Sequence, residues 1–219
     1  AMRRAIGHFN LAWMAAVIIP MVAMGPLVEH HARWTLAGVA AGNFLALIPL
    51  WRIAPNPAPH DKQVTKRHVP PAYPALLRSA RVLLPLSYLL MAALSPVIPY
   101  RFEVIEAPIA LEAPIASSWA IVRLAVVALM WRLAFWHGKW MTLLVAALAM
   151  SGGFACAVLA PTVPVLVVGL AFFGAGQGAV YYAALYYGMA VGHAEIAAGE
   201  RHEALIGSGY SLGPRLGLA

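Results

Sequence analysis

Residues 163–191 read VPVLVVGLAFFGAGQGAVYYAALYYGMAV, a run of 29 residues without a charged side chain. A helix of this length rises about 44 Å at about 1.5 Å per residue, which is enough to cross the roughly 30 Å hydrocarbon core of a bilayer. A helix that is apolar on every face must be buried, either in a large protein core or in lipid. The run therefore predicts a transmembrane helix.

The composition of the whole chain also predicts a protein that lies mainly in lipid. Hydrophobic residues make up 62% of the 219 residues and charged residues only 11%, whereas soluble domains carry about 25% charged residues. The net charge of +7 does not predict nucleic-acid binding, because the basic residues lie between apolar runs and do not gather on one face with aromatics. The single cysteine, Cys156, excludes a disulfide framework.

Six further apolar runs accompany the first. The seven predicted spans are Phe9–Val28, Trp34–Trp51, Val82–Tyr100, Ile115–Trp131, Met141–Leu159, Val163–Val191 and Ala204–Ala219. None shows the period-2 alternation of a membrane β-barrel, and helices satisfy their own backbone hydrogen bonds in lipid. The predicted fold is all-α, a polytopic transmembrane helical bundle of about seven spans.

The basic residues are distributed unevenly between the two predicted sides of the membrane. Eleven of the fifteen Lys and Arg residues lie on the side that holds the start of the chain and residues 52–81, 132–140 and 192–203. Only Arg33 and Arg101 lie on the other side. The positive-inside rule places the first side in the cytoplasm. We therefore expect a multi-pass protein of the cell (inner) membrane with residues 52–81 cytoplasmic.

The longest connection, residues 52–81, is rich in proline and basic residues and predicts a stiff linker. A weak repeat relates the two ends of the chain: at an offset of 194 residues, His8 pairs with His202, and Pro20 pairs with Pro214. Duplicated halves are typical of secondary transporters. The apolar run that stops at Ala219 also predicts that helices of the same chain are missing from this sequence.

Two motifs carry a family resemblance. They are Gly174-Ala-Gly176-Gln-Gly178 with Tyr181-Tyr182, and Gly207-x-Gly209-x3-Gly213-Pro214. With the topology, they make the chain similar to a major facilitator superfamily (MFS) transporter, whose twelve helices form two bundles of six. The resemblance implies that residues 1–51 are the last two helices of an N-terminal bundle, that 52–81 join the bundles, and that 82–219 are a C-terminal bundle truncated in its fifth helix.

The family's loop motif, of the form G-x3-D-R-x-G-R-R, is altered in this chain. At the corresponding place stands Phe135-Trp136-His137-Gly138-Lys139-Trp140, in which only Gly138 and Lys139 match. Phe135 and Trp136 replace the acid and the first arginine.

Arg123 is the most informative single residue because it lies inside a predicted span. Its predicted depth is about two turns from the outer end of the helix, or roughly 10–12 Å. An arginine near mid-membrane costs at least about 2.5–3.5 kcal/mol and usually faces a cavity or a partner. The partner could be an acid on a missing helix, a cluster of backbone carbonyls or an anionic solute. The alternative is a packing arginine that lies against Trp119.

Four further polar residues are candidates for a substrate cavity. The resemblance implies that Gln177 and Tyr181 line it from the family's tenth helix and that Ser87 and Tyr88 line it from the seventh. Tyr186 and Tyr187 are instead typical of an interfacial aromatic belt. Gly174 and Gly178 form a small-xxx-small pair for close helix packing, the role also expected for Gly209, Gly213 and Pro214. Because it lies within an apolar run, the glycine motif is not a dinucleotide fingerprint.

The sequence predicts no metal site, no cofactor and no enzymatic activity. Glu29-His30-His31 are three adjacent residues and make a poor chelate. We expect a secondary transporter that moves a small solute by alternating access between two helical bundles. The alternative is a non-transporting membrane scaffold or an accessory subunit of a larger complex. The expected partners are the lipid bilayer, a small-molecule solute and the missing helices, but not nucleic acid.

Overall fold

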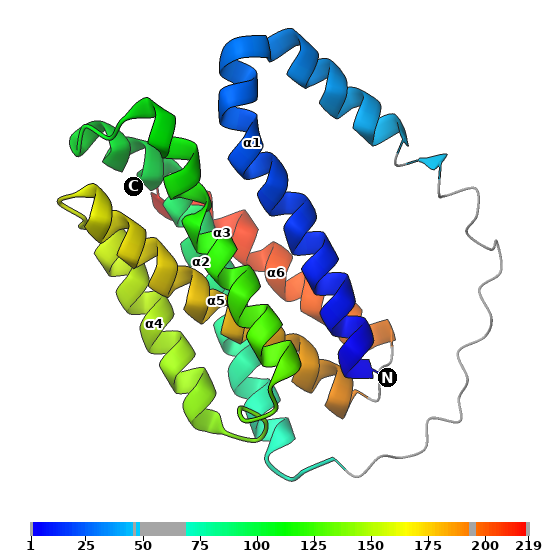
Figure 1. Ribbon diagram of the computed structural model, residues 1–219. Coiled ribbons are helices and arrows are strands. Elements are labelled where there is room, and N and C mark those ends of the chain that lie inside the picture. Colours follow the sequence, from blue (N-terminus) through cyan, green and yellow to red (C-terminus); the bar gives the residue numbers. More distant parts are fainter. Residues whose placement is uncertain (1, 46, 49–68, 193–195, 218–219) are drawn as a thin grey trace.

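The helices of the computed structural model run up and down between two ends of one bundle (Figure 1). The structure describes residues 2–45, 47–48, 69–192 and 196–217. Over these ranges the chain forms six α-helices and no strand: α1 Met2–Leu45, α2 Tyr73–Val104, α3 Ile109–Arg132, α4 Trp140–Val158, α5 Val163–Val191 and α6 Ile196–Gly217. The predicted all-α bundle is confirmed.

Four of these helices, α2 to α5, are long and apolar enough to cross a membrane. The chain is therefore a membrane protein, and these helices match four of the seven predicted spans. The first run gives a shorter apolar helix, Gly7–Ala23. The last run does not qualify over the described residues, because α6 begins at Ile196 and its first turns carry Glu200, Arg201 and Glu203.

The boundaries of α2 differ from the predicted ones. α5 spans the predicted residues, but α2 begins at Tyr73 and not at Val82, so the last part of the predicted linker is helical. Pro74 lies in the first turn of α2, where a missing N–H costs nothing. The helix then continues through Pro96 and Pro99, so neither proline ends it. Residues 52–68 of the linker lie outside the described residues.

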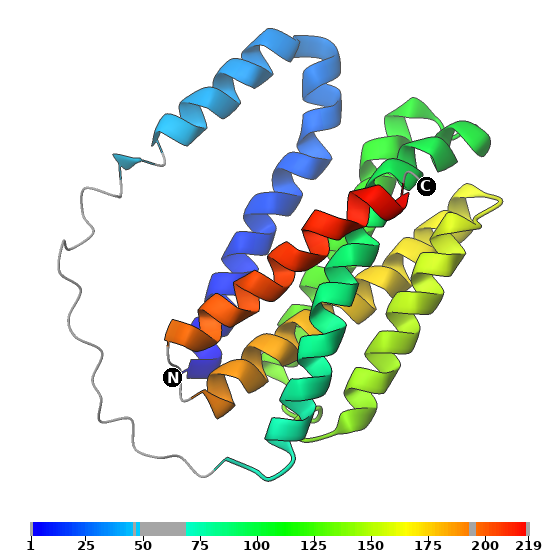
Figure 2. The same ribbon diagram turned by 180° about the vertical axis from the view of Figure 1, so that it is seen from behind.

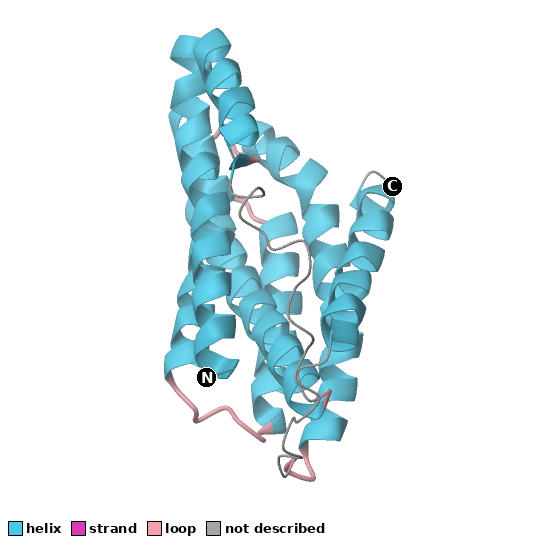
Figure 3. Ribbon diagram, turned by 90° about the vertical axis from the view of Figure 1, so that its right-hand side faces the viewer, coloured by secondary structure: helices cyan, strands magenta, loops and turns pink. Residues whose placement is uncertain are grey.

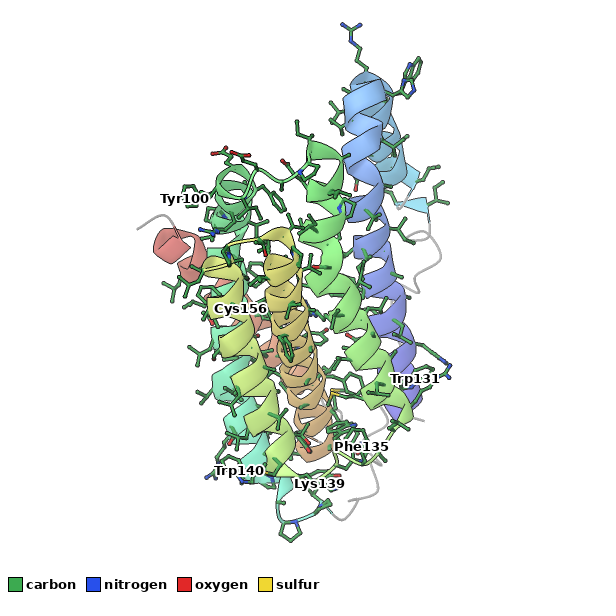
Figure 4. All side chains as sticks on the ribbon, turned by 60° about the vertical axis from the view of Figure 1, so that its left-hand side comes forward. Tyr100, Trp131, Phe135, Lys139, Trp140 and Cys156 are labelled. Atoms are coloured by element: carbon green, nitrogen blue, oxygen red, sulfur yellow. The ribbon has the colours of Figure 1, made fainter. Side chains whose placement is uncertain are left out.

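The connections alternate between the two ends of the bundle. The starts of α1, α2 and α6 and the turn at 133–139 lie at what we call the lower end (Figure 1). The turns at 105–108 and 159–162 lie at the upper end, as a view from the side also shows (Figure 3). Exposed aromatic side chains occur near both ends, with Tyr100 at the upper end and Phe135 and Trp140 at the lower (Figure 4). Such aromatic residues are typical of the two membrane interfaces.

A kink divides α1 into two arms. His31 has non-helical backbone angles, φ −143° and ψ 46°, at the position predicted as a turn between two spans. The first arm packs against α3. The second arm, from Ala32 to Leu45, is exposed almost throughout, and the hydroxyl of Thr35 donates back across the kink to the carbonyl of Leu27 at 2.9 Å.

Close helix contacts are made through glycine. A Cβ at Gly174 or Gly178 of α5 would meet the α3 backbone, at Trp119 and Arg123 respectively. Gly209 and Gly213 of α6 lie equally close to α2, which is its neighbour at the rear of the bundle (Figure 2). All four positions predicted for helix packing therefore lie at helix contacts. Pro214 lies within α6, but its side chain is outside the described residues.

Candidate functional site

Arg123 lies near the middle of α3 and is buried, with 4% of its surface exposed. It is fourteen residues from Ile109 and nine from Arg132, which corresponds to about 21 Å and 14 Å along the helix. Arg123 is farther from the upper end of α3 than the predicted two turns, because α3 begins six residues before the predicted Ile115. The guanidinium therefore lies well inside the bundle.

The partners of this guanidinium are aromatic. Nη2 of Arg123 donates to the hydroxyl of Tyr88 at 2.7 Å. The guanidinium carbon lies 4.7 Å from the ring centroid of Tyr181, 5.5 Å from that of Tyr88 and 5.9 Å from that of Trp13. All three distances are within the range of a cation–π interaction. Trp119, the predicted packing partner, instead lies edge-on to Phe173.

Aromatic partners are sufficient to keep this arginine in the bundle. Burial of the charge costs about 2.5–3.5 kcal/mol on insertion scales. A cation–π contact contributes about 0.5–2 kcal/mol, and a hydrogen bond to a charged group about 1.5–3 kcal/mol. Three contacts and one hydrogen bond therefore offset the cost without a carboxylate.

A second layer of contacts holds the aromatic rings in place. The hydroxyl of Tyr181 donates to Oδ1 of Asn10 at 2.7 Å, and the ring of His202 lies 5.2 Å from that of Tyr181. We call the whole group the arginine cluster: Asn10, Trp13, Tyr88, Arg123, Tyr181 and His202. It brings together side chains from α1, α2, α3, α5 and α6.

Several buried polar atoms at or beside this cluster have no hydrogen-bond partner among the described residues. They are Nε of Arg123, Nε2 of His202 and, one turn before Tyr181 on α5, Oε1 of Gln177. Each of these side chains is at most 6% exposed. Buried polar groups in native proteins are nearly always hydrogen-bonded, to protein or to an ordered small molecule. These three atoms keep the capacity to donate or accept a further hydrogen bond.

An apolar cavity of about 530 Å³ lies one turn above the arginine cluster. It is lined from α1, α2, α3, α5 and α6, by residues that include Val17, Met91, Trp119, Phe173 and Tyr210. Met91 follows Tyr88 by one turn on α2, and Trp119 precedes Arg123 by one turn on the descending α3. The volume is in the usual range for small-molecule sites.

Two contacts connect the cavity wall to the polar residues below it. Nε2 of Gln177 donates to Sδ of Met91 at 3.1 Å, and the ring of Tyr210 lies 5.1 Å from that of Tyr88. None of the five predicted cavity residues lines the cavity itself. Arg123, Tyr88 and Tyr181 are in contact beneath it, and Gln177 lies at its edge. Ser87 is separate, because its hydroxyl donates to the carbonyl of Leu84 in its own helix.

A second aromatic group, the tryptophan cluster, lies at the lower end. It consists of Tyr73, Trp136, His137, Tyr182, Tyr186 and Tyr187. Trp136 is fully buried, and its Nε1 donates to the carbonyls of Met130 and Leu133 at 2.9 and 3.0 Å. The backbone N–H of Gly138, which has φ +71°, donates to the hydroxyl of Tyr187 at 3.2 Å. Tyr187 is 1% exposed, so it holds the 133–139 turn and does not form part of a lipid-facing belt.

Three features of the site were not predicted from the sequence: the roles of Trp13 and Tyr210 and the burial of His202. Trp13 is one of several aromatics in an apolar run, and no spacing within α1 relates it to Arg123 on α3. For Tyr210, the signal was its position one residue after Gly209, which packs on Tyr88. Within the described part of the chain, no group of three or more His, Cys, Asp or Glu residues could hold a metal ion.

Comparison with known proteins gives no relative. No protein-family model, no curated protein and no solved structure matches the chain.

Proposed function

We propose that the chain is part of a secondary transporter of the MFS type, which moves a small solute across the membrane by alternating access. The observation that carries the proposal is the buried Arg123, held by aromatic residues directly below an apolar cavity. Ionisable residues inside membrane helices are expensive and usually mark a solute or ion pathway. Five helices contribute to both the cavity and the cluster, so a relative movement of these helices would change both.

We propose further that the lower end faces the cytoplasm of a cell (inner) membrane. Among the described basic residues, Arg78, Arg81, Arg132, Lys139 and Arg201 belong to that end, whereas Arg33 and Arg101 belong to the other. The basic linker of residues 52–81 would be cytoplasmic in this orientation. The support is the positive-inside rule, which follows the Lys and Arg content of short loops.

Uptake by proteoliposomes tests the proposal. The protein would be reconstituted, and uptake of labelled glucose, alanine, benzoate and choline compared with that of protein-free liposomes. The decisive variant is Arg123→Gln, with Arg132→Gln as the matched control because Arg132 is exposed at the end of the same helix. We expect uptake of at least one solute, its loss in R123Q at an unchanged folded yield, and its retention in R132Q.

A non-transporting scaffold is the second candidate, and the second arm of α1 favours it. Trp34, Leu36 and Phe44 are 79, 64 and 73% exposed, so this arm offers an apolar surface to other helices. A scaffold predicts that no solute is taken up and that R123Q lowers the yield of folded protein. That result would contradict the transport proposal.

A further inference from the structure

The guanidinium of Arg123 has bonding capacity that the protein does not use. An arginine carries five N–H donors, and the described residues supply one hydrogen-bond acceptor, the neutral hydroxyl of Tyr88. Nε of Arg123 has no partner among these residues. Because Tyr88 accepts this bond, its own proton remains to be donated. Two donors, one charged and one neutral, therefore lie together one turn below the cavity.

An anion is the chemical group that these donors fit. Hydrogen bonds between a guanidinium and an anionic oxygen are about twice as strong as those between neutral groups, and burial strengthens them further. An ammonium group would be repelled by Arg123. A neutral hydroxyl would gain no more than Tyr88 already provides.

The single buried charge and the lining of the cavity also restrict the net charge and the polarity of the ligand. Arg123 is the one buried Lys or Arg in the described parts of α2 to α5, since Arg78 and Arg132 are exposed and Arg81 and Arg101 are half-buried. One buried cation balances one negative charge. The cavity above is lined mainly by apolar side chains, with Ser95 and Tyr210 as the hydroxyl-bearing exceptions, so it favours an apolar body.

We propose that the site binds a monoanionic amphiphile, with its carboxylate or sulfonate on Arg123 and Tyr88 and its apolar body in the 530 Å³ cavity. This inference rests on the proposed function and names the class of solute. The anionic group would enter from the cavity and complete the donors of Arg123 that now have no partner. The apolar body would lie against Met91, Trp119 and Phe173.

Binding of three matched probes tests this inference without relying on transport. 1-Naphthoate, 1-naphthalenemethanol and 1-naphthylmethylammonium share one apolar body and differ in charge. Their affinities would be measured by calorimetry on the protein in lipid nanodiscs, with empty nanodiscs subtracted. We expect naphthoate to bind at least about tenfold more tightly than the other two, because one charge-assisted hydrogen bond exceeds the free energy of a tenfold change.

Two variants separate the contributions of charge and cavity. Arg123→Gln should reduce naphthoate affinity at least tenfold and abolish the preference for the anion, whereas the control Arg132→Gln should change neither. Ser95→Phe fills the cavity from an exposed position and should lower the affinity for all three probes. This second variant keeps the inference testable if R123Q does not fold. An unchanged naphthoate affinity in S95F would overturn the inference. Equal affinities of the wild-type protein for the three probes would also overturn it.

The outcomes also distinguish this inference from the proposed function. Arg123-dependent naphthoate binding without uptake of any solute would support the ligand class and contradict transport. Arg123-dependent uptake of glucose, alanine or choline without a preference for naphthoate would support transport and overturn the ligand class.

Discussion

The arginine cluster and the tryptophan cluster are both rich in aromatic side chains, yet they differ in how the polar atoms of their central residues, Arg123 and Trp136, are satisfied. In the tryptophan cluster, Nε1 of Trp136 has two carbonyl acceptors and the hydroxyl of Tyr187 accepts the Gly138 N–H. In the arginine cluster, Nε of Arg123 and Nε2 of His202 have no partner among the described residues. The two groups therefore differ at their central side chains: the ring N–H of Trp136 has its acceptors, whereas Arg123 keeps a donor that the described residues do not use.

This difference separates a structural contact from a candidate site. Removing one partner of a buried polar pair is costly because the other loses its hydrogen bond. In the tryptophan cluster, loss of Trp136 would take its N–H from two carbonyls and leave a space where a fully buried ring was. The arginine cluster keeps donors free next to a cavity, which is useful only when something else binds there.

The largest expected effect is on stability, at Trp136. The substitution Trp136→Ala should lower the free energy of unfolding by about 3–5 kcal/mol, because it leaves a large cavity where a fully buried ring was. Unfolding in mixed micelles, followed by tryptophan fluorescence or circular dichroism, measures it. Trp140→Ala is the control, since Trp140 is 60% exposed, and should change stability much less. Equal losses in the two variants would contradict the structural role of the tryptophan cluster.

A smaller effect is expected at the contact that brings Tyr181 to Arg123. A Cβ in Gly174→Ala would collide with the backbone of Trp119, so α5 and α3 would have to separate, at a cost of about 1–3 kcal/mol. The same unfolding assay measures the loss. Gly152→Ala of α4 is the matched control, because a Cβ there meets nothing within 4 Å. It should leave the free energy of unfolding unchanged or raise it slightly. If G174A is as stable as G152A, the close approach of α5 to α3 is not required.

The smallest effect on stability is expected at Arg123 itself. Arg123→Gln removes the burial cost of about 2.5–3.5 kcal/mol together with contacts of similar size, so the free energy of unfolding should change by less than about 1 kcal/mol in either direction. Micelle unfolding and naphthoate titration of the same samples would be compared. A loss of about 3 kcal/mol or more would place Arg123 with the structural residues and remove the contrast between the clusters.

Much of the helical architecture was predictable because lipid imposes a simple rule on sequence. Apolar runs long enough to cross the membrane must be helices, and α5 accordingly spans Val163–Val191 as predicted. Boundaries were less accurate at α2 and α3, where the helix continues past the apolar run through Tyr73 and Ile109. Hydropathy marks the part of a helix that is in lipid, whereas helix ends are determined by local backbone geometry.

The site was predictable only in part. Arg123 stood out because a charge in an apolar run is costly wherever the helix lies. Tyr181 was expected only as a cavity residue and Trp13 was not singled out, and because the two are 168 positions apart in the chain, their contact with Arg123 was not predictable. Their meeting depends on how α1, α3 and α5 pack.

By itself, the sequence determined that this chain is a helical membrane protein with a buried arginine, because the cost of placing polar groups in lipid acts on each residue alone. Only the tertiary structure decided that Arg123 is surrounded by three aromatic rings, that Tyr187 holds the 133–139 turn, and that a cavity opens one turn above the arginine. Those features depend on helix packing, in which the absence of a Cβ at Gly174 and Gly178 brings α5 against α3. Packing is a property of pairs of surfaces, and no single run of sequence contains it.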